Sequence, residues 1–181
     1  MHAECAETVR RRGTVTLPQG TVIGMLSPAR MTDAVAQLMT DYMTWAHERL
    51  ANECGIHEPP ADPADIRDHL DDFRAPKGRL LLAECDGEPA GVGALRMLSE
   101  IKRMYVTPER RDRHLGSAIL DQLLDEAQSR RSRTVLLDTC RFMTDAQRLY
   151  RSRGFAERPP YEGTEIPERV RQHWIFFERE L

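Results

Sequence analysis

The sequence lacks the features that mark several large classes of protein. Its four cysteines are far apart and form no Cys-x-x-Cys pair; they are Cys5, Cys54, Cys85 and Cys140. This spacing supports neither a metal site nor a disulfide framework, and it favours a reducing, cytoplasmic setting. No apolar run approaches the ~20 residues that a membrane-spanning helix needs. No apolar segment of the signal-peptide type follows the arginines at 10–12. We therefore expect a soluble cytoplasmic protein with no bound metal.

Strong net charge, internal repeats and low-complexity segments are also absent. The formal net charge is −3 and the isoelectric point is about 6.1, so the overall charge does not indicate binding to nucleic acid or to a membrane. A local cluster of basic residues between positions 102 and 113 leaves nucleic-acid binding as an alternative, but few aromatic stacking partners accompany it. The length favours one domain, which we place at residues 20–181 after a flexible arm at residues 1–19.

The pattern of apolar residues predicts an α/β (α+β) fold. Strands are expected where apolar and β-branched residues run between turn residues, and helices where apolar residues recur every three to four positions. The expected order is strand 21–26, helices 32–52 and 63–73, strands 79–84, 89–98 and 100–106, a helix from 115, strand 133–138, helix 143–153, a strand from 155 and strand 173–177. This order predicts a mixed sheet of about seven strands flanked by about four helices.

Two of the strand connections are short. Asp86-Gly87 is a strong signal for a two-residue hairpin. Only Leu98-Ser99 separates the next two expected strands, and neither residue favours the positive φ that a tight hairpin needs. Turn chemistry therefore explains the first connection and leaves the second without a physical account.

A strand, a basic turn and a helix follow one another between Glu100 and Leu120. Pro108 ends the strand because proline has no N–H group to donate to a ladder. From Leu115 the apolar residues recur with a helical period. The backbone N–H groups at the start of such a helix are unpaired and lie at the positive end of its dipole, so the turn is a candidate phosphate site.

This segment resembles the acetyl-CoA-binding core of the GNAT acyltransferase superfamily. The family's loop reads Gln/Arg-x-x-Gly-x-Gly/Ala, and residues 111–116 occupy it with His114 in place of the first Gly. Histidine is among the non-glycine residues that tolerate left-handed backbone geometry. Further matches are Leu-Asp-Thr at 137–139, Ala-x-x-Leu-Tyr at 146–150 and Gly-Phe at 154–155. The resemblance implies the same order of elements over most of the chain.

The resemblance also implies where acetyl-CoA, the expected cosubstrate, would bind. Its phosphates would contact the loop and the helix start, where arginine forks pair well with phosphate oxygens. The backbone of strand 100–106 would line the pantetheine arm where it parts from strand 133–138, with an amide near Met104 facing the thioester oxygen. The alternative is a solvated basic helix start without a ligand. The expected cofactor-binding residues are Met104, Tyr105, Val106, Arg111, Asp112, Arg113, His114, Leu115, Gly116 and Ser117.

Two side chains are candidates for proton transfer. Glu100 lies where several family members place a catalytic Glu, and a partly buried carboxylate with a raised pKa would act as general base. Alternation along the strand would place it on the same side as Lys102, Met104 and Val106, unless a bulge intervenes. Tyr150 matches the tyrosine that the family uses to protonate the departing CoA thiolate. The alternatives are a Glu100 that pairs with Lys102, and a packed Tyr150 whose hydroxyl bonds a carbonyl.

Other residues invite functional interpretations that we do not favour. Cys140 follows a predicted strand, but no histidine is near it in sequence, so we interpret it as a buried bystander rather than an acyl-carrying nucleophile. Tyr42 and Trp45 belong to the apolar stripe of helix 32–52, which we interpret as core packing.

The sequence as a whole predicts an acetyl-CoA-dependent N-acyltransferase (EC 2.3.1 type). It would acetylate a primary amine, on a small molecule or a peptide, by direct attack on the thioester. The alternative is a catalytically silent CoA sensor or partner-binding module with the same fold. We expect no nucleic-acid or membrane partner, and a homodimer remains open.

Overall fold

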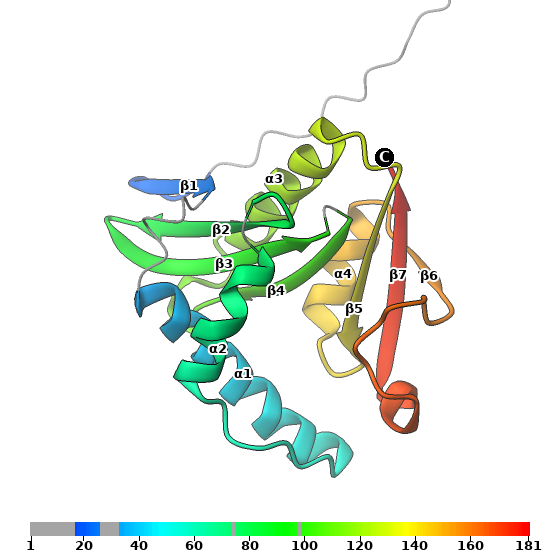
Figure 1. Ribbon diagram of the computed structural model, residues 1–181. Helices are drawn as coiled ribbons and strands as arrows, with labels where there is room; N and C mark the ends of the chain where they lie inside the picture. The colour runs from blue at the N-terminus through cyan, green and yellow to red at the C-terminus, as the bar shows by residue number, and fades with distance from the viewer. Residues whose placement is uncertain (1–16, 26–32, 74, 98) are drawn as a thin grey trace, which may run out of the picture.

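The computed structural model describes residues 17–25, 33–73, 75–97 and 99–181. These residues form a seven-stranded mixed sheet with helices on both faces, as Figure 1 shows. The strands are β1 (Thr21–Met25), β2 (Gly78–Cys85), β3 (Glu88–Arg96), β4 (Glu100–Val106), β5 (Thr134–Cys140), β6 (Ala156–Arg158) and β7 (Trp174–Glu180). The helices are α1 (Asp33–Cys54), α2 (Pro63–His69), α3 (Leu115–Ser129) and α4 (Thr144–Ser152). The predicted fold class and order of elements are confirmed.

The strands are arranged in the order β1-β2-β3-β4-β5-β7-β6. β4 and β5 pair in parallel, and the other neighbouring strands pair antiparallel. The chain passes from β4 to β5 through α3, which is the crossover that a parallel pair requires. The two halves of the sheet therefore meet at β4 and β5.

Several elements end at other residues than the sequence predicts. β5 extends to Cys140 and β7 to Glu180, because the two strands pair with each other along their whole length. The last residues of β7 are Glu178, Arg179 and Glu180, which give no apolar signal. Residue 26 of the first predicted strand and residue 32 of the first predicted helix lie outside the described residues.

Hydrophobic clusters cover both faces of the sheet. The cluster between the sheet and helices α3 and α4 includes Leu81, Leu95, Ile119, Leu123, Leu137 and Phe177. The cluster beneath α1 and α2 includes Val35, Met39, Leu80, Leu82, Val92 and Tyr105. Because both faces are covered, β2 has a continuous apolar run instead of an alternating pattern. Leu17, which belongs to the predicted N-terminal arm, packs on a third small cluster around Leu115.

The two short connections have different geometries. Asp86 and Gly87 have φ values of 54° and 82°, as a type I′ hairpin requires, so the predicted hairpin is confirmed. In the next connection the positive φ of 47° falls at Met97, and the Ser99 amide donates to the Arg96 carbonyl at 3.1 Å. β3 therefore ends at Arg96, two residues before the predicted end, and the connection is three residues long.

A β-bulge in β4 determines which side chains share a face. The register between β3 and β4 shifts where Arg103 has a φ of 55°. Before this bulge Glu100 and Lys102 lie on the α1 face, and after it Met104 and Val106 pack into the cluster beneath α3. Glu100 therefore shares a side with Lys102, as predicted, but not with Met104 and Val106, because the bulge that the prediction named as its exception is present.

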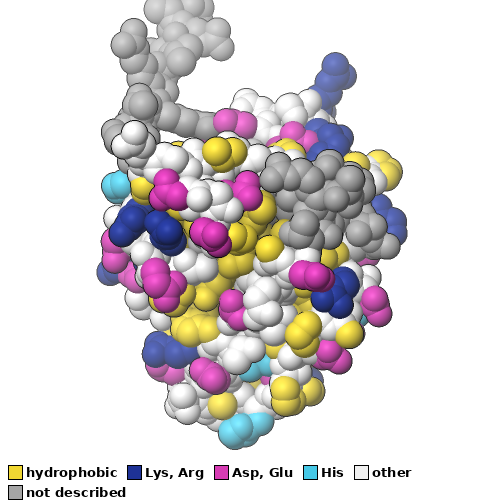
Figure 2. All heavy atoms as spheres, turned by 90° about the vertical axis from the view of Figure 1, so that its left-hand side faces the viewer, with side chains coloured by type: hydrophobic (Ala, Val, Ile, Leu, Met, Phe, Trp, Pro, Cys, Tyr) yellow, Lys and Arg dark blue, Asp and Glu magenta, His cyan; other side chains and the backbone are white. Residues whose placement is uncertain are grey.

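Two observations concern the helices and one face of the described surface. None of the described helices is long and apolar enough to cross a membrane. On the face shown in Figure 2, acidic and basic side chains are interspersed, with hydrophobic ones between them. This part of the surface therefore offers no continuous positive patch for a nucleic acid.

Candidate active site

β4 and β5 separate soon after they begin to pair. Their ladder contains two pairs, Glu100 with Leu136 and Ile101 with Leu137. Beyond Ile101, the β4 edge that faces β5 makes no ladder with the described part of β5, so this edge can pair with a ligand. The sequence resemblance implied this parting, and the structure shows it.

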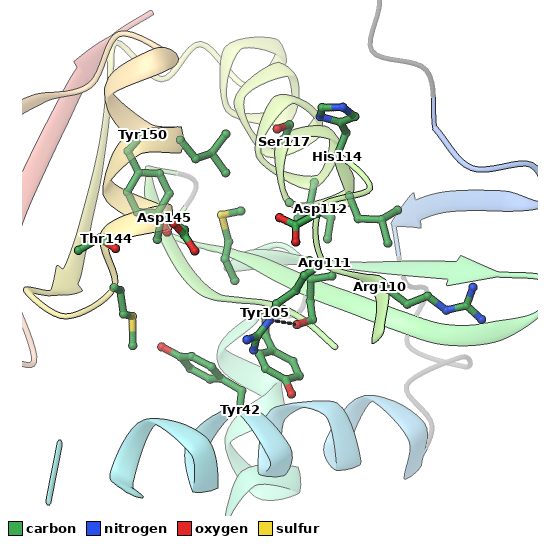
Figure 3. A pocket seen from close by; sticks show the side chains of 18 of the residues that line it. Tyr42, Tyr105, Arg110, Arg111, Asp112, His114, Ser117, Thr144, Asp145 and Tyr150 are labelled. Carbon is green, nitrogen blue, oxygen red and sulfur yellow. Dashed lines mark hydrogen bonds between the residues drawn. The ribbon is translucent and has the colours of Figure 1, made fainter. Parts of the chain in front are cut away.

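A cleft of about 730 Å³ lies where the strands part. It is lined by α1, by the end of β4, by the loop into α3 and by the start of α4. Figure 3 shows Arg111 and Asp112 on one side, Asp145 and Tyr150 of α4 on another, and Tyr42 of α1 facing them. The volume lies within the ordinary range of small-molecule sites.

In the loop before α3, two non-glycine residues adopt positive φ angles, and one of them is His114, which replaces a glycine of the family's loop. His114 has φ 63° and ψ 8°, a left-handed conformation, and it is the N-cap residue of α3 without a side-chain capping bond. Asp112 has a φ of 59°. The predicted tolerance of His114 for left-handed geometry is confirmed. By helix geometry, the N–H groups of Leu115, Gly116 and Ser117 have no intrahelical acceptor, and these residues line the cleft.

The predicted cofactor-binding residues lie together at the cleft, with one exception. Met104, Tyr105, Val106, Arg111, Asp112, His114, Leu115, Gly116 and Ser117 line it, whereas Arg113 is exposed and does not. The Arg111 Nε atom donates to the Val106 carbonyl at 3.3 Å, and its guanidinium carbon lies 5.4 Å from the centre of the Trp45 ring. Arg111 thus connects the loop to α1, by a contact worth about 0.5–1 kcal/mol.

Tyr150 lies at the cleft, where its ring packs against other aromatic rings. The ring packs against Phe155 and Phe177, with both centroid distances 6.0 Å. The hydroxyl forms no hydrogen bond with any residue that the structure describes, so the alternative of a tyrosine tied to a carbonyl is not observed. Burial raises the pKa of Tyr150 well above its usual value, so the phenol carries its proton at neutral pH.

Glu100 occupies a different environment from the one predicted. Its carboxylate is buried, does not line the cleft, and accepts from Arg96 Nε at 2.8 Å and from the Tyr161 hydroxyl at 2.6 Å. Lys102 Nζ lies 3.0 Å from the same carboxylate. Burial alone would raise the pKa of Glu100, but Lys102, Tyr161 and Arg96 outweigh burial and lower it. The predicted raised pKa is therefore wrong, and pairing with Lys102, the alternative, is observed.

The charges around Glu100 form a network across the point where the strands part. Lys102 Nζ also lies 2.8 Å from Asp138 Oδ2, so it joins β4 to β5. Tyr161, from the connection between β6 and β7, lies 2.8 Å from the same Asp138 oxygen. Sequence reasoning missed Tyr161 because its partners are at least 23 residues away in the chain and no local pattern indicates them.

Side chains of α1 that the sequence assigned to the core also reach the cleft. Val35, Leu38, Met39 and Leu50 are buried as predicted. Tyr42 and Trp45 are only half-buried and line the cleft together with Arg49. The spacing of these three residues, at i, i+3 and i+7 on one helix face, was the available signal.

Two further observations concern the Cys140 thiol and the metal-ligand residue types among the described side chains. Burial raises the pKa of Cys140 to about 12, so this thiol stays protonated and is a poor nucleophile. No group of three or more described His, Cys, Asp or Glu residues is placed to hold a metal ion.

Comparison with known proteins identifies the class to which this fold and cleft belong. Residues 33–155 match the model of the acetyltransferase (GNAT) family. The chain therefore belongs to the GNAT acetyltransferase family, and the predicted resemblance is confirmed.

Among individual relatives, an IAA acetyltransferase of Azospirillum brasilense is 33% identical over 107 residues, which cover 56% of this chain and 69% of that protein. An acetyltransferase from Streptococcus agalactiae has a similar fold, with a TM-score of 0.70, 18% identity, and coverage of 90% of this chain and 99% of that one. A Salmonella typhimurium protein, yncA, solved with its cofactor acetyl-CoA, has a TM-score of 0.64 and 17% identity, with coverage of 90% and 94%. At these identities the two solved structures establish the fold alone.

Proposed function

We propose that the protein transfers an acetyl group from acetyl-CoA directly to a primary amine. The observation that carries the proposal is the single cleft that joins the N-terminus of α3, the free edge of β4 and Tyr150. The pyrophosphate binds the N–H groups at the start of α3, beside the charge of Arg111. The pantetheine arm pairs with the β4 edge after Ile101, and an amide near Met104 stabilises the oxyanion.

The reaction requires one proton to leave the amine and one to reach sulfur. The ammonium form of the acceptor first loses a proton to solvent, and the neutral nitrogen attacks the thioester carbonyl carbon. As the tetrahedral intermediate collapses, the C–S bond breaks and Tyr150 donates its proton to the thiolate. The second proton of the attacking nitrogen then returns to the Tyr150 oxygen through water. The products are an N-acetyl amide, CoA with a free thiol and one released proton.

The role of Glu100 as general base stays a prediction. The contacts with Arg96, Lys102 and Tyr161 instead support a structural role, in which Glu100 keeps Lys102 placed between β4 and β5. A general base would make turnover of the Glu100→Gln variant depend on pH in a way that a structural residue would not. The two roles are therefore separable by pH–rate profiles.

The experiment that tests the proposed function is a screen of amines, amino acids and peptides with acetyl-CoA, followed by detection of free thiol. Thiol release that requires both the enzyme and an acceptor supports the acetyltransferase. CoA binding by calorimetry without any amine-dependent thiol release would instead support the silent CoA sensor. Absence of CoA binding would contradict both functions.

A further inference from the structure

One wall of the cleft combines aromatic rings with a guanidinium group. We define this aromatic wall as Tyr42, Trp45 and Arg49 of α1 together with Phe142, which follows β5; all four line the cleft. The Trp45 ring lies 6.2 Å from the Phe142 ring, edge to face, and 6.4 Å from the Tyr42 ring. The Arg49 guanidinium carbon lies 5.4 Å above the centre of the Phe142 ring. The wall therefore offers apolar faces and a positive charge in one place.

The guanidinium of Arg49 belongs to this wall and is only weakly held by the protein. Its Nη2 atom pairs with Glu53 Oε1 at 2.7 Å, but both side chains are more than 40% exposed, so this ion pair is weak. Its Nε atom is buried and has no hydrogen-bond partner among the residues described. A buried N–H group without a partner is unfavourable. The part of the guanidinium that is open to the cleft can bind a ligand oxygen, because its ion pair with Glu53 is weak.

A second guanidinium lies close to the wall. Arg103, the bulge residue of β4, donates to the sulfur of Met43 at 3.3 Å and forms no ion pair with the described residues. Burial raises the pKa of Tyr42 to about 12, and the positive charge of Arg103 acts against that rise. The nearby carboxylate of Asp138 is already paired with Lys102. Arg103 therefore adds a positive charge beside α1, next to the cleft that Arg49 lines.

We propose that the acceptor is a small primary amine that also carries a carboxylate and an aromatic or large apolar group, as an aromatic amino acid does. Its carboxylate binds Arg49, and its side group packs on Trp45 and Phe142. This proposal rests on the proposed function, since it names the acceptor of the same reaction. The acetyl-pantetheine arm takes up part of the 730 Å³ cleft, so the space that remains suits a small acceptor.

Matched acceptor pairs test the carboxylate directly. Phenylalanine and 2-phenylethylamine differ by the carboxylate alone, as do tryptophan and tryptamine. We expect wild-type kcat/KM to be roughly 10- to 100-fold higher for the carboxylated member of each pair, the range of a hydrogen bond to a charged group. Arg49→Gln should remove this preference by raising KM for the amino acids, with little change for the amines that lack a carboxylate.

Two further variants make the result specific to Arg49. Arg67→Gln removes an exposed arginine of α2 that pairs with Asp33 and does not line the cleft, so it should keep the preference. Glu53→Gln releases Arg49 from its ion pair and should keep or increase the preference. Thermal unfolding should show that all three variants remain folded, and CoA affinity measured by calorimetry should be unchanged in Arg49→Gln.

Each contrary outcome has a distinct meaning. Equal or faster acetylation of the decarboxylated amines by the wild type would overturn the acceptor proposal and leave the proposed function intact. A folded Arg49→Gln variant that keeps the preference, or that loses CoA affinity, would show that Arg49 is not the carboxylate partner. Thiol release with none of the four acceptors, nor with any amine of the wider screen, would count against the proposed function itself.

Discussion

Replacing Tyr150 with Phe removes one hydroxyl group from the cleft and changes little else. The Tyr150 hydroxyl has no hydrogen-bond partner among the described residues, and the ring contacts with Phe155 and Phe177 remain in the variant. The free energy of unfolding should therefore change by no more than about 0.5 kcal/mol. Loss of a general acid should lower kcat by about 10²-fold or more, which corresponds to roughly 2.7 kcal/mol of transition-state stabilisation.

The assay for Tyr150→Phe combines free-thiol detection with a second acyl donor. With acetyl-CoA the variant should be slow at every pH, because the pKa of the wild-type phenol is raised and its proton is present throughout the working range. With nitrophenyl acetate as the acyl donor, the leaving group needs no proton. The loss of turnover in the variant should then be much smaller. CoA affinity by calorimetry should be unchanged. A folded variant with wild-type turnover of acetyl-CoA would refute the assignment of Tyr150.

The remaining predictions concern the loop and the buried charge network. Arg111→Glu should weaken CoA binding by about tenfold or more in calorimetry. Arg113→Glu is the control, because it reverses an exposed charge outside the cleft, and it should weaken CoA binding less. Equal losses of CoA affinity in the two variants would mean that only net charge matters. His114→Gly should keep or improve CoA affinity, because glycine adopts the φ of 63° without strain; a clear loss would show that the imidazole contacts phosphate. Glu100→Gln should cost about 1–3 kcal/mol in denaturant unfolding at neutral pH. Because the pKa of Glu100 is lowered in the folded protein, this stabilisation is complete above the usual glutamate pKa of about 4.3 and is lost as the pH falls below it. A kcat defect of Glu100→Gln that shrinks as the pH rises would establish the general base, whereas we expect a defect that does not depend on pH.

The order of elements was predictable because each one carries a local signal. Pro63 begins α2, Asp86-Gly87 turns the chain between β2 and β3, and Gly154 with a φ of 82° follows α4. The apolar period of α3 begins at Leu115 in the sequence, where the structure also begins the helix. Propensity and turn chemistry at these positions agree with the fold, so the sequence alone was sufficient.

The errors arose where distant residues decide the geometry. The bulge in β4 falls at Arg103, and arginine gives no sign of the positive φ that reverses the alternation of Glu100 and Met104. The lowered pKa of Glu100 depends on Tyr161, which is 61 residues away in the chain. Tyr42 packs against the core cluster as predicted, but an apolar stripe does not show that the same side chain also lines the cleft where the sheet opens beneath it. Such features come from tertiary contacts that local patterns do not record.

Direct transfer within the cleft is tested most sharply with acetyl-CoA that carries a labelled acetyl group. We predict that the label appears in the amine in equal amount with free CoA thiol, and that the intact protein carries no acetyl group before the acceptor is added. Cys140, whose pKa is raised to about 12, should remain unmodified throughout. Accumulation of label on the protein in the absence of an acceptor, or binding of acetyl-CoA with no amine-dependent thiol release, would contradict the account.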